Sequence, residues 1–296
     1  MAPVAHIMAL CSVFNRREIT RKSIAALLSQ SVPAGVELSV VVVDDGSTDG
    51  TSQMLATYFP SVRVVSTGGG YYWAGAMVYG FQNAWDPEAF THLLVFNDDI
   101  VIEQHALMRL LDISLACDKT QVPCVVVGAL TDSISGRPTY GGLCRLRWRP
   151  KIYFSPVELS ECEKSVDTLN MNFALINAAS ISSFGFLDPA FVHGYADFDY
   201  GLRVTDHGGS VIQAPGFIGH CSRNKVDGTW LDFRLPFRER WRLMLGAKGL
   251  PPRERLYYLR KHVPIVWLPV FLYPYAKMPF QHLWKAAVRW VVNFFS

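Results

Sequence analysis

The sequence predicts an α/β fold built on an open, mostly parallel sheet with helices on both faces. Strand-like apolar runs alternate with helix-like periodicity over the first ~130 residues, which is typical of such sheets. Residues 38–43 are dominated by valine, as expected for a central parallel strand that is covered on both faces. Residues 93–96 are uniformly apolar and lead directly into Asn97, Asp98 and Asp99, the pattern of a buried strand that ends in a polar loop.

The remaining elements follow in chain order. Residues 6–13 are mostly apolar and predict the first strand, while Ile24, Leu27 and Leu28 repeat at helical spacing. Gly208 and Gly209 are expected to end the last helix of the first domain. Strands are predicted over residues 6–13, 38–43, 62–66, 93–96, 125–127 and 211–213. Helices are predicted over residues 19–30, 53–58, 74–84, 104–117 and 197–207. Residues 131–168 carry a weaker pattern, which predicts a hairpin insertion.

Composition limits the class of protein. The chain has 296 residues, half of them hydrophobic, and a mean hydropathy of +0.16, so it can bury a sizeable core. A net charge of +3 argues against nucleic-acid binding by bulk electrostatics. The six cysteines form no C-x-x-C pair, so reduced structural thiols are favoured over a metal or disulfide site. The N-terminus lacks a basic region and is interpreted as the first strand, not a signal peptide, which implies a cytoplasmic protein.

The C-terminal part of the chain differs in composition. We expect a globular domain over residues 1–230 and a helical extension, rich in aromatic and basic residues, over 231–296. The apolar run 263–276 is interrupted by prolines and shorter than the ~20 residues of a membrane span. Lys277, Lys285 and Arg289 lie among aromatic residues, as in an amphipathic helix on a membrane surface. Alternatively, the extension packs on the domain or forms an oligomer interface. The first interpretation places the protein peripherally on the inner face of the plasma membrane.

Polar residues follow several predicted strands. The segments around Asn15, Asp44, Thr67 and Asp98 each come directly after a strand. Ligands of open α/β sheets bind at the carboxyl ends of the strands, so these segments should converge on one crevice. The segment Asp44-Asp45-Gly46-Ser47 has two equally good interpretations. It could be a simple turn, or one of its carboxylates could accept hydrogen bonds from a base or a ribose.

Asp98 and Asp99 are adjacent carboxylates at the end of a buried strand. They repel each other and require a positive partner, which could be a basic side chain, a helix N-terminus or a metal ion. Carboxylate oxygens suit Mg²⁺ or Mn²⁺, which commonly bind one or two carboxylates together with substrate phosphates. The alternative is that one aspartate caps the helix that follows.

A third acidic segment lies at residues 193–203. If a helix begins near Phe198, Asp197 is its N-cap and Asp199 can pair with Arg203 four residues later. Equally, Asp197 could act as the general base that deprotonates an acceptor hydroxyl. His220 is isolated in the sequence, but its imidazole could complete a metal site with Asp99.

Together these segments resemble the inverting family-2 glycosyltransferases, which have the GT-A fold. The similar strings are SVFNRRE, VVVVDDGSTDGT, VFNDDI, ADFDYGLR and GHCSR, and the resemblance covers about residues 6–225. It implies a sugar-nucleotide donor, a UDP- or dTDP-sugar, and a divalent cation, Mg²⁺ or Mn²⁺. It further implies a glycan or lipid-linked glycan acceptor, as in polysaccharide and lipopolysaccharide biosynthesis.

The resemblance also assigns roles to residues. Asp44 would contact the nucleotide base, and Asp98 with Asp99 would form the DXD-type motif. Because Asn97 stands at its first position, the metal role falls mainly on Asp99, which His220 joins. Asp197 would be the catalytic base, supported by Asp199 and Arg203. Other donor-binding residues would be Asn15, Asp45, Gly70, Trp73 and Asp98.

The glycine-rich loop at residues 67–80, TGGGYYWAGAMVYG, looks like the donor loop of a subgroup that includes rhamnosyl- and galactofuranosyl-type transferases. Two other classes were weighed. A nucleotidyltransferase is disfavoured, because its glycine-rich phosphate loop after the first strand is absent from SVFNRRE. A non-catalytic sugar-nucleotide-binding or membrane-associated scaffold is kept open by Ala196 and Asn97, which replace acidic residues of the family pattern.

Overall fold

The computed structural model describes residues 4–146 and 148–295, with side chains described up to residue 282 and at 284. The chain divides into two compact units. The first comprises residues 1–145 and 154–223, and the second comprises residues 146–153 and 224–296. Each unit is described by itself. The side chains of Lys285 and Arg289, which contributed to the predicted membrane anchor, lie outside the described residues.

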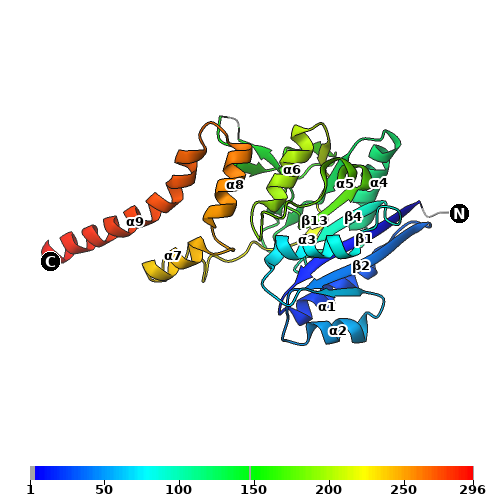
Figure 1. Ribbon diagram of the computed structural model, residues 1–296, viewed down its shortest axis with the longest axis horizontal. Helices are drawn as coiled ribbons and strands as arrows, with labels where there is room; N and C mark the ends of the chain where they lie inside the picture. The colour runs from blue at the N-terminus through cyan, green and yellow to red at the C-terminus, as the bar shows by residue number, and fades with distance from the viewer. Residues whose placement is uncertain (1–3, 147, 296) are drawn as a thin grey trace. The chain divides into compact units, whose positions relative to one another are not determined.

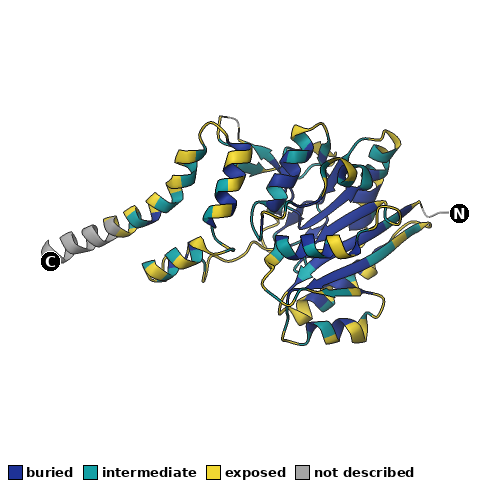
Figure 2. Ribbon diagram, in the orientation of Figure 1, coloured by how far each residue is buried: buried dark blue, intermediate teal, exposed yellow. Residues whose placement is uncertain are grey.

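The first unit is built on an eight-stranded sheet (Figure 1). Across the sheet the strands are β11 (Lys164–Ser165), β14 (Ser210–Gln213), β6 (Cys124–Val127), β13 (Phe173–Asn177), β4 (His92–Phe96), β1 (Ala5–Val13), β2 (Val36–Asp44) and β3 (Arg63–Ser66). Six of them run in one direction, while β13 and β11 are antiparallel to their neighbours. The central strands are buried along their length (Figure 2).

Helices cover both faces of this sheet. Their bounds are α1 (Arg17–Leu28), α2 (Thr51–Tyr58), α3 (Tyr72–Ala84), α4 (Ala106–Lys119), α5 (Ala178–Phe184) and α6 (Ala196–Asp206). Apolar residues of α1, α2 and α4 join one core cluster with alternate residues of the strands. On the opposite face α3 packs closely, because a Cβ at Gly80 would come within 2.3 Å of Val43. The predicted fold class is confirmed, and each predicted helix and strand is present with ends shifted by at most two residues.

The direction of β13 was not predicted. This strand lies between β4 and β6 and is antiparallel to both. All five of its residues are buried. A strand buried on both faces has the same apolar pattern in either direction, so periodicity does not report its orientation. The sheet is therefore mostly parallel, but mixed.

Two small sheets complete the first unit. One contains β10 (Phe154–Pro156), β9 (Gly142–Arg145) and β12 (Thr168–Leu169), and the other contains β5 (Val101–Ile102), β15 (Gly219–His220), β7 (Leu130–Thr131) and β8 (Pro138–Tyr140). Strands β9 and β10 pair antiparallel, which confirms the predicted hairpin. The second sheet is important for the site, because β15 and β5 bring His220 beside the segment that follows Asp99.

The second unit is helical. It contains α7 (Phe237–Leu245), α8 (Pro252–His262) and α9 (Trp267–Phe295), the last with Pro274 and Pro279 inside it. The predicted helical extension is therefore confirmed. Within the described residues, none of the helices combines the length and the hydropathy of a segment that spans a bilayer.

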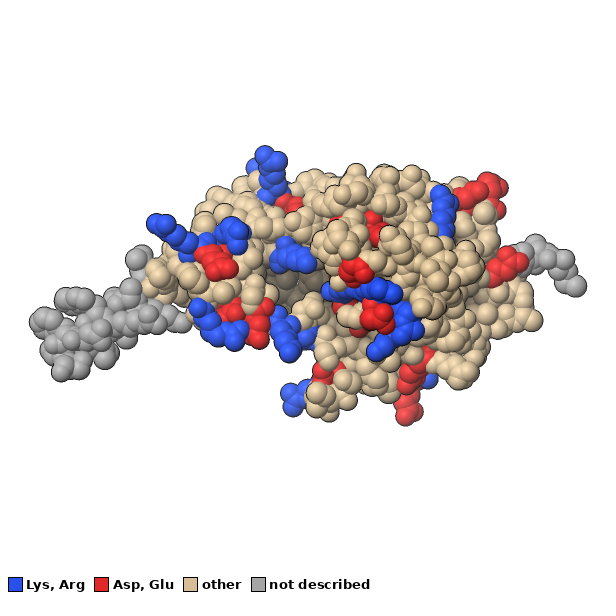
Figure 3. Space-filling model, turned by 90° about the horizontal axis from the view of Figure 1, so that it is seen from below, with Lys and Arg blue, Asp and Glu red and all other residues tan. Residues whose placement is uncertain are grey.

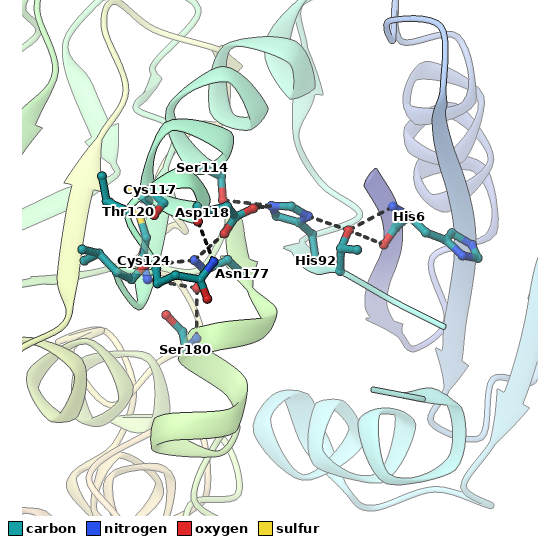
Figure 4. A network of polar contacts seen from close by, with 12 residues as sticks. His6, His92, Ser114, Cys117, Asp118, Thr120, Cys124, Asn177 and Ser180 are labelled. Atoms are coloured by element: carbon teal, nitrogen blue, oxygen red, sulfur yellow. Dashed lines mark hydrogen bonds and ion pairs between the residues drawn. The ribbon is translucent and has the colours of Figure 1, made fainter. Parts of the chain in front are cut away.

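A buried polar network joins several elements at the end of the sheet where β4 and β6 begin (Figure 4). His92 is fully buried and contacts the hydroxyl of Ser114 at 3.0 Å and the carboxylate of Asp118 at 3.3 Å. Asn177 donates to Asp118 at 2.8 Å and accepts from the Cys124 N–H at 3.0 Å. These contacts satisfy polar groups that would otherwise be buried without partners, so the network has a structural role.

Candidate functional site

The loops after β1 and β2 are joined to each other at the carboxyl end of the sheet. The side-chain oxygen of Asn15 accepts from the Thr48 N–H at 2.7 Å, and the Asn15 N–H donates to the Ser47 hydroxyl at 2.9 Å. Asn15 has a φ of 52°, a left-handed conformation that asparagine tolerates better than most residues. The expected convergence of these two segments is therefore confirmed.

Asp44 and Asp45 are both buried, and each is held by the protein itself. Asp44 accepts from the Ser47 N–H at 2.7 Å and from the Ser52 hydroxyl. Asp45 accepts from the Thr67 hydroxyl at 2.6 Å and from the N–H of Tyr72 at 2.8 Å. Asp45 thereby fixes the loop after β3 at the start of α3, while the base-contacting role of Asp44 stays a prediction.

The glycine-rich loop needs its glycines for two reasons. Gly69 and Gly70 have φ values of 105° and 87°, which residues with a Cβ rarely adopt. A Cβ on Gly46 would lie 2.9 Å from the Cα of Gly69, so the two loops approach backbone to backbone. A Cβ at Gly70 would meet no atom within 4 Å, so this glycine faces open space.

Trp73 connects this loop to the acidic motif. Its indole N–H donates to Oδ1 of Asn97 at 3.0 Å. Because an indole nitrogen only donates, the side-chain oxygen of Asn97 must face Trp73. Asn97 is therefore fixed by the protein, with its NH₂ group directed away from the indole.

Arg16 is the positive partner of the adjacent carboxylates. Its Nη1 lies 2.9 Å from Oδ1 of Asp98 and 3.1 Å from Oδ2 of Asp99. Asp98 is 3% exposed and also accepts from the Thr20 hydroxyl at 2.9 Å. Burial raises the pKa of Asp98, whereas Arg16 and Thr20 act in the opposite direction. The alternative that an aspartate caps the following helix is wrong, since α4 begins at Ala106 after an intervening strand.

Asp197 lies in the first turn of α6. The expected N-cap position is wrong by two residues: the helix begins at Ala196, and Tyr195, with a φ of 65°, precedes it. Asp197 accepts from its neighbour Phe198 N–H at 2.9 Å. Burial raises its pKa to about 6, although this hydrogen bond lowers it. A carboxylate with a pKa near neutrality suits general base catalysis.

Hydrogen bonds link Asp197 to the acidic motif and to the glycine-rich loop. The Asn170 side chain donates to Asp197 at 3.4 Å, and the Asn97 N–H donates to the Asn172 carbonyl at 2.9 Å. From the other side, the carbonyl of Val192 accepts from the N–H of Ala74 at 3.0 Å. With the bond between Trp73 and Asn97, four chain segments close a ring around the carboxyl end of the sheet.

Asp199 and Arg203 fix the position of α6. Asp199 is fully buried, and Nε of Arg203 donates to it at 2.9 Å, which confirms the predicted pair. The same guanidinium donates to the carbonyls of Phe184 and Phe186. The pair therefore ties α6 to the end of α5 and the residues just after it, and holds Asp197 indirectly.

Asp99 and His220 are the predicted ligands of a divalent cation. Oδ1 of Asp99 is buried and has no hydrogen-bond partner within the described residues. His220 pairs with Val101, two residues after Asp99, and one ring nitrogen contacts the Thr131 hydroxyl at 2.9 Å. No group of three or more His, Cys, Asp or Glu side chains suited to a metal occurs in the described part of the chain. Asp99 and His220 could supply one or two ligands, so phosphate oxygens of a ligand would have to complete the shell of an ion held there.

Three contributors to the site were not predicted from the sequence: Arg16, the segment 170–172 and the carbonyl of Val192. Arg16 could have been found, because it follows the first strand and two carboxylates follow a neighbouring one. The other contacts use amide side chains and backbone groups, which occur everywhere in a sequence and indicate nothing before the fold is known.

Comparison with known proteins identifies the fold and the family. A crystal structure of GalNAc-T7 with UDP, GalNAc and Mn²⁺ is similar to this chain, with a TM-score of 0.60 and 12% identity. The similarity covers 78% of this chain and 49% of that one, so the chain spans about half the length of that protein. It shows a GT-A-type fold. No curated protein matches the chain.

The family model for glycosyl transferase family 2 matches residues 10–173, which is more than half of the chain. The chain belongs to glycosyl transferase family 2. The matched range includes the loops of Asp44, Trp73 and Asp98 and ends before Asp197. Family and fold together support glycosyl transfer as the class of reaction.

Proposed function

We propose that the protein transfers a sugar from a UDP- or dTDP-sugar to a hydroxyl of a glycan or lipid-linked glycan, with inversion at the anomeric carbon. One observation carries this proposal. The ring of hydrogen bonds through Trp73, Asn97, Asn170 and Asp197 joins the glycine-rich loop, the acidic motif and the candidate base. The subgroup related to rhamnosyl- and galactofuranosyl-type transferases is part of the proposal and rests on the resemblance of the glycine-rich loop.

In the proposed reaction, Asp197 accepts the proton of the acceptor hydroxyl while that oxygen bonds to the anomeric carbon. The bond from this carbon to the diphosphate oxygen breaks, and its electron pair leaves with the nucleoside diphosphate. Attack from the side opposite the leaving group inverts the configuration. The pKa of about 6 leaves Asp197 ionised and ready to accept a proton at neutral pH.

The donor would be held by the loops that converge on the sheet end. The nucleoside would lie beside Asn15, Asp44 and Asp45, which would contact it directly or through the loops they order. The sugar would lie beside Gly70 and Trp73. A divalent cation, when bound at Asp99 and His220, would neutralise charge on the leaving diphosphate. Two observations support it: the buried Asp99 oxygen that lacks a partner in the described residues, and the Mn²⁺ and UDP in the GalNAc-T7 structure.

A panel of sugar nucleotides tests the proposal. In the presence of Mn²⁺, at least one UDP- or dTDP-sugar should raise the melting temperature, because a ligand that binds only the folded state stabilises it. The same compound should release free sugar slowly, with water replacing the acceptor. A scaffold with a decayed site would bind a nucleotide but release no sugar. If no sugar nucleotide changes the melting temperature, the proposed donor class is wrong.

We further propose that α9 contacts a membrane surface, with the protein on the inner face of the plasma membrane. Along this helix, Leu268, Leu272, Phe280 and Trp284 are spaced by multiples of four residues, and each is between 48% and 67% exposed. Residues four apart are neighbours on a helix surface, so Leu268 with Leu272 and Phe280 with Trp284 form two exposed apolar pairs along α9. Lys277 lies 5.3 Å from the ring of Tyr273, which places a cation between these two pairs in the sequence. Exposed apolar side chains beside a lysine suit the interface of an anionic bilayer.

Vesicle sedimentation tests this contact. The full-length protein should sediment with vesicles containing anionic lipids, and a variant with Leu272→Ser, Phe280→Ser and Trp284→Ser should bind at least tenfold less. Ile134→Ser is the matched control, because Ile134 is 94% exposed in the first unit. Equal sedimentation of the triple variant and the unaltered protein would eliminate the α9 surface as a membrane contact. Loss of a dimer in the triple variant would instead indicate an oligomer interface.

A further inference from the structure

Arg16 occupies the position between the two carboxylates of the acidic motif. A single nitrogen, Nη1, contacts Asp98 at 2.9 Å and Asp99 at 3.1 Å. Magnesium–oxygen distances are about 2.0–2.1 Å, so a cation held by the Asp99 oxygen that Nη1 contacts would have to displace the guanidinium. Without a cation, two adjacent carboxylates would repel each other. Arg16 thus supplies the positive charge that the motif requires when no metal is present.

The other half of the Arg16 guanidinium is available. Within the described residues, Nε and Nη2 make no hydrogen bond, and the side chain is 43% exposed. A guanidinium edge with two parallel N–H donors matches the geometry of a phosphate. The face seen in Figure 3 carries basic and acidic side chains side by side rather than a surface of one sign. The free edge of Arg16 is a donor pair that an individual phosphate group can accept from.

We propose that Arg16 is an internal counter-ion of the acidic motif that competes with the divalent cation for Asp99. The donor diphosphate relieves this competition by drawing the guanidinium onto its phosphate oxygens. This inference rests on the proposed function, since it requires a nucleoside diphosphate at the site. Its consequence is that metal and nucleotide bind with positive coupling. The protein without nucleotide binds the metal weakly. The nucleotide releases the carboxylates from Arg16 and adds its phosphate oxygens as ligands of the metal.

The coupling is measured as the Kd of Mn²⁺ with and without UDP. If a dTDP-sugar is the compound that raises the melting temperature, dTDP replaces UDP. Electron paramagnetic resonance of free Mn²⁺ gives the metal Kd without any turnover. For the unaltered protein, the nucleotide should tighten Mn²⁺ binding at least tenfold, and Mn²⁺ should tighten the nucleotide by the same factor. In Arg16→Gln, Mn²⁺ binding without nucleotide should become at least tenfold tighter, and Mn²⁺ alone should raise the melting temperature.

Two further variants separate competition from simpler effects. Arg17→Gln removes the same charge one residue later, where the side chain lies 3.9 Å from Glu18, and should change the Mn²⁺ Kd less than twofold. Arg16→Lys keeps the positive charge and therefore still competes with the cation, but it lacks the paired N–H donors of the guanidinium edge. It should bind Mn²⁺ alone like the unaltered protein and bind the nucleotide at least fivefold more weakly.

Three results would overturn the inference. The first is an unchanged Mn²⁺ Kd in folded Arg16→Gln without nucleotide. The second is an equal gain in Arg17→Gln, which would indicate a general charge effect. The third is a Mn²⁺ Kd of the unaltered protein that is the same with and without a nucleotide, although the nucleotide itself binds. If neither UDP nor dTDP binds at all, the proposed function fails, and the inference fails with it.

Discussion

Asp197→Asn is expected to lower the rate of sugar transfer by a factor of about 10² to 10⁴ while leaving nucleotide binding intact, because general base catalysis typically contributes that much. The amide cannot accept the proton of the acceptor hydroxyl, yet it keeps the size of the carboxylate and can accept from the Phe198 N–H. In the unaltered protein, kcat/KM should rise as the pH passes through about 6, when Asp197 ionises, and then level off. The variant should lack this rise. Transfer assays at pH 5 to 8 measure both effects.

The same substitution should stabilise the fold above pH 6. The pKa of Asp197 is about 6 in the folded protein against 3.8 for an unperturbed aspartate. Between these values the folded state binds the proton more tightly than the unfolded state, so stability falls as the pH rises. Above pH 6 the full penalty applies, at most about 3 kcal/mol. The melting temperature of Asp197→Asn should therefore exceed that of the unaltered protein at pH 8 and match it near pH 4.

Asp112→Asn is the matched control, since Asp112 is exposed on α4. It should change neither the rate nor the pH dependence of stability. Turnover of Asp197→Asn at the unaltered rate would remove Asp197 as the base. A difference in melting temperature that is the same at pH 4 and pH 8 would show that Asp197 is not held in an environment that disfavours its charge.

Asn177→Ala is expected to destabilise the fold by roughly 3–5 kcal/mol, because it leaves several buried polar groups without partners. Asn177 is fully buried and makes four hydrogen bonds (Figure 4). Its oxygen accepts from the N–H groups of Cys124 and Ser180, and its NH₂ group donates to Asp118 and to the Val122 carbonyl. The bond to Ser180 is also the N-cap of α5.

Thermal unfolding measures this effect, with an expected decrease in melting temperature on the order of 10 °C. Asn83→Ala is the control, because Asn83 is exposed and its side chain makes one local bond, to the Tyr79 carbonyl at 2.8 Å. Asn177 lies at the end of the sheet opposite the proposed site, so well below its melting temperature the variant should retain donor binding. Equal melting temperatures for the two variants would show that the network contributes little.

Much of the fold could be predicted from the sequence because its central strands are buried and its helices are amphipathic. The runs at residues 38–43 and 93–96 are apolar apart from Ser39, and burial in a core removes such runs from water. The orientation of β13 could not be predicted, since its burial on both faces removes the alternation that would distinguish one arrangement from another. The short strands of the second sheet, such as β15 with two residues, are below the length at which periodicity exists.

The site was predicted in part for a related physical reason. Residues that follow strands of a parallel sheet must meet at one end, which the bonds of Asn15 to Thr48 and of Thr67 to Asp45 confirm. Charge alone left three candidates for the partner of Asp98 and Asp99. The structure places Arg16 there, and only the distances of 2.9 and 3.1 Å decide this.

The crystal structure of this protein with Mn²⁺ and the nucleotide that stabilises it tests the central claim most directly, namely that one donor site is shared by these loops. We expect the diphosphate within hydrogen-bond distance of Arg16, the ion on Asp99, and the space for the sugar between Trp73 and Asp197. A nucleotide bound elsewhere, or one that leaves Asp197 on a surface separate from the diphosphate, would contradict the account.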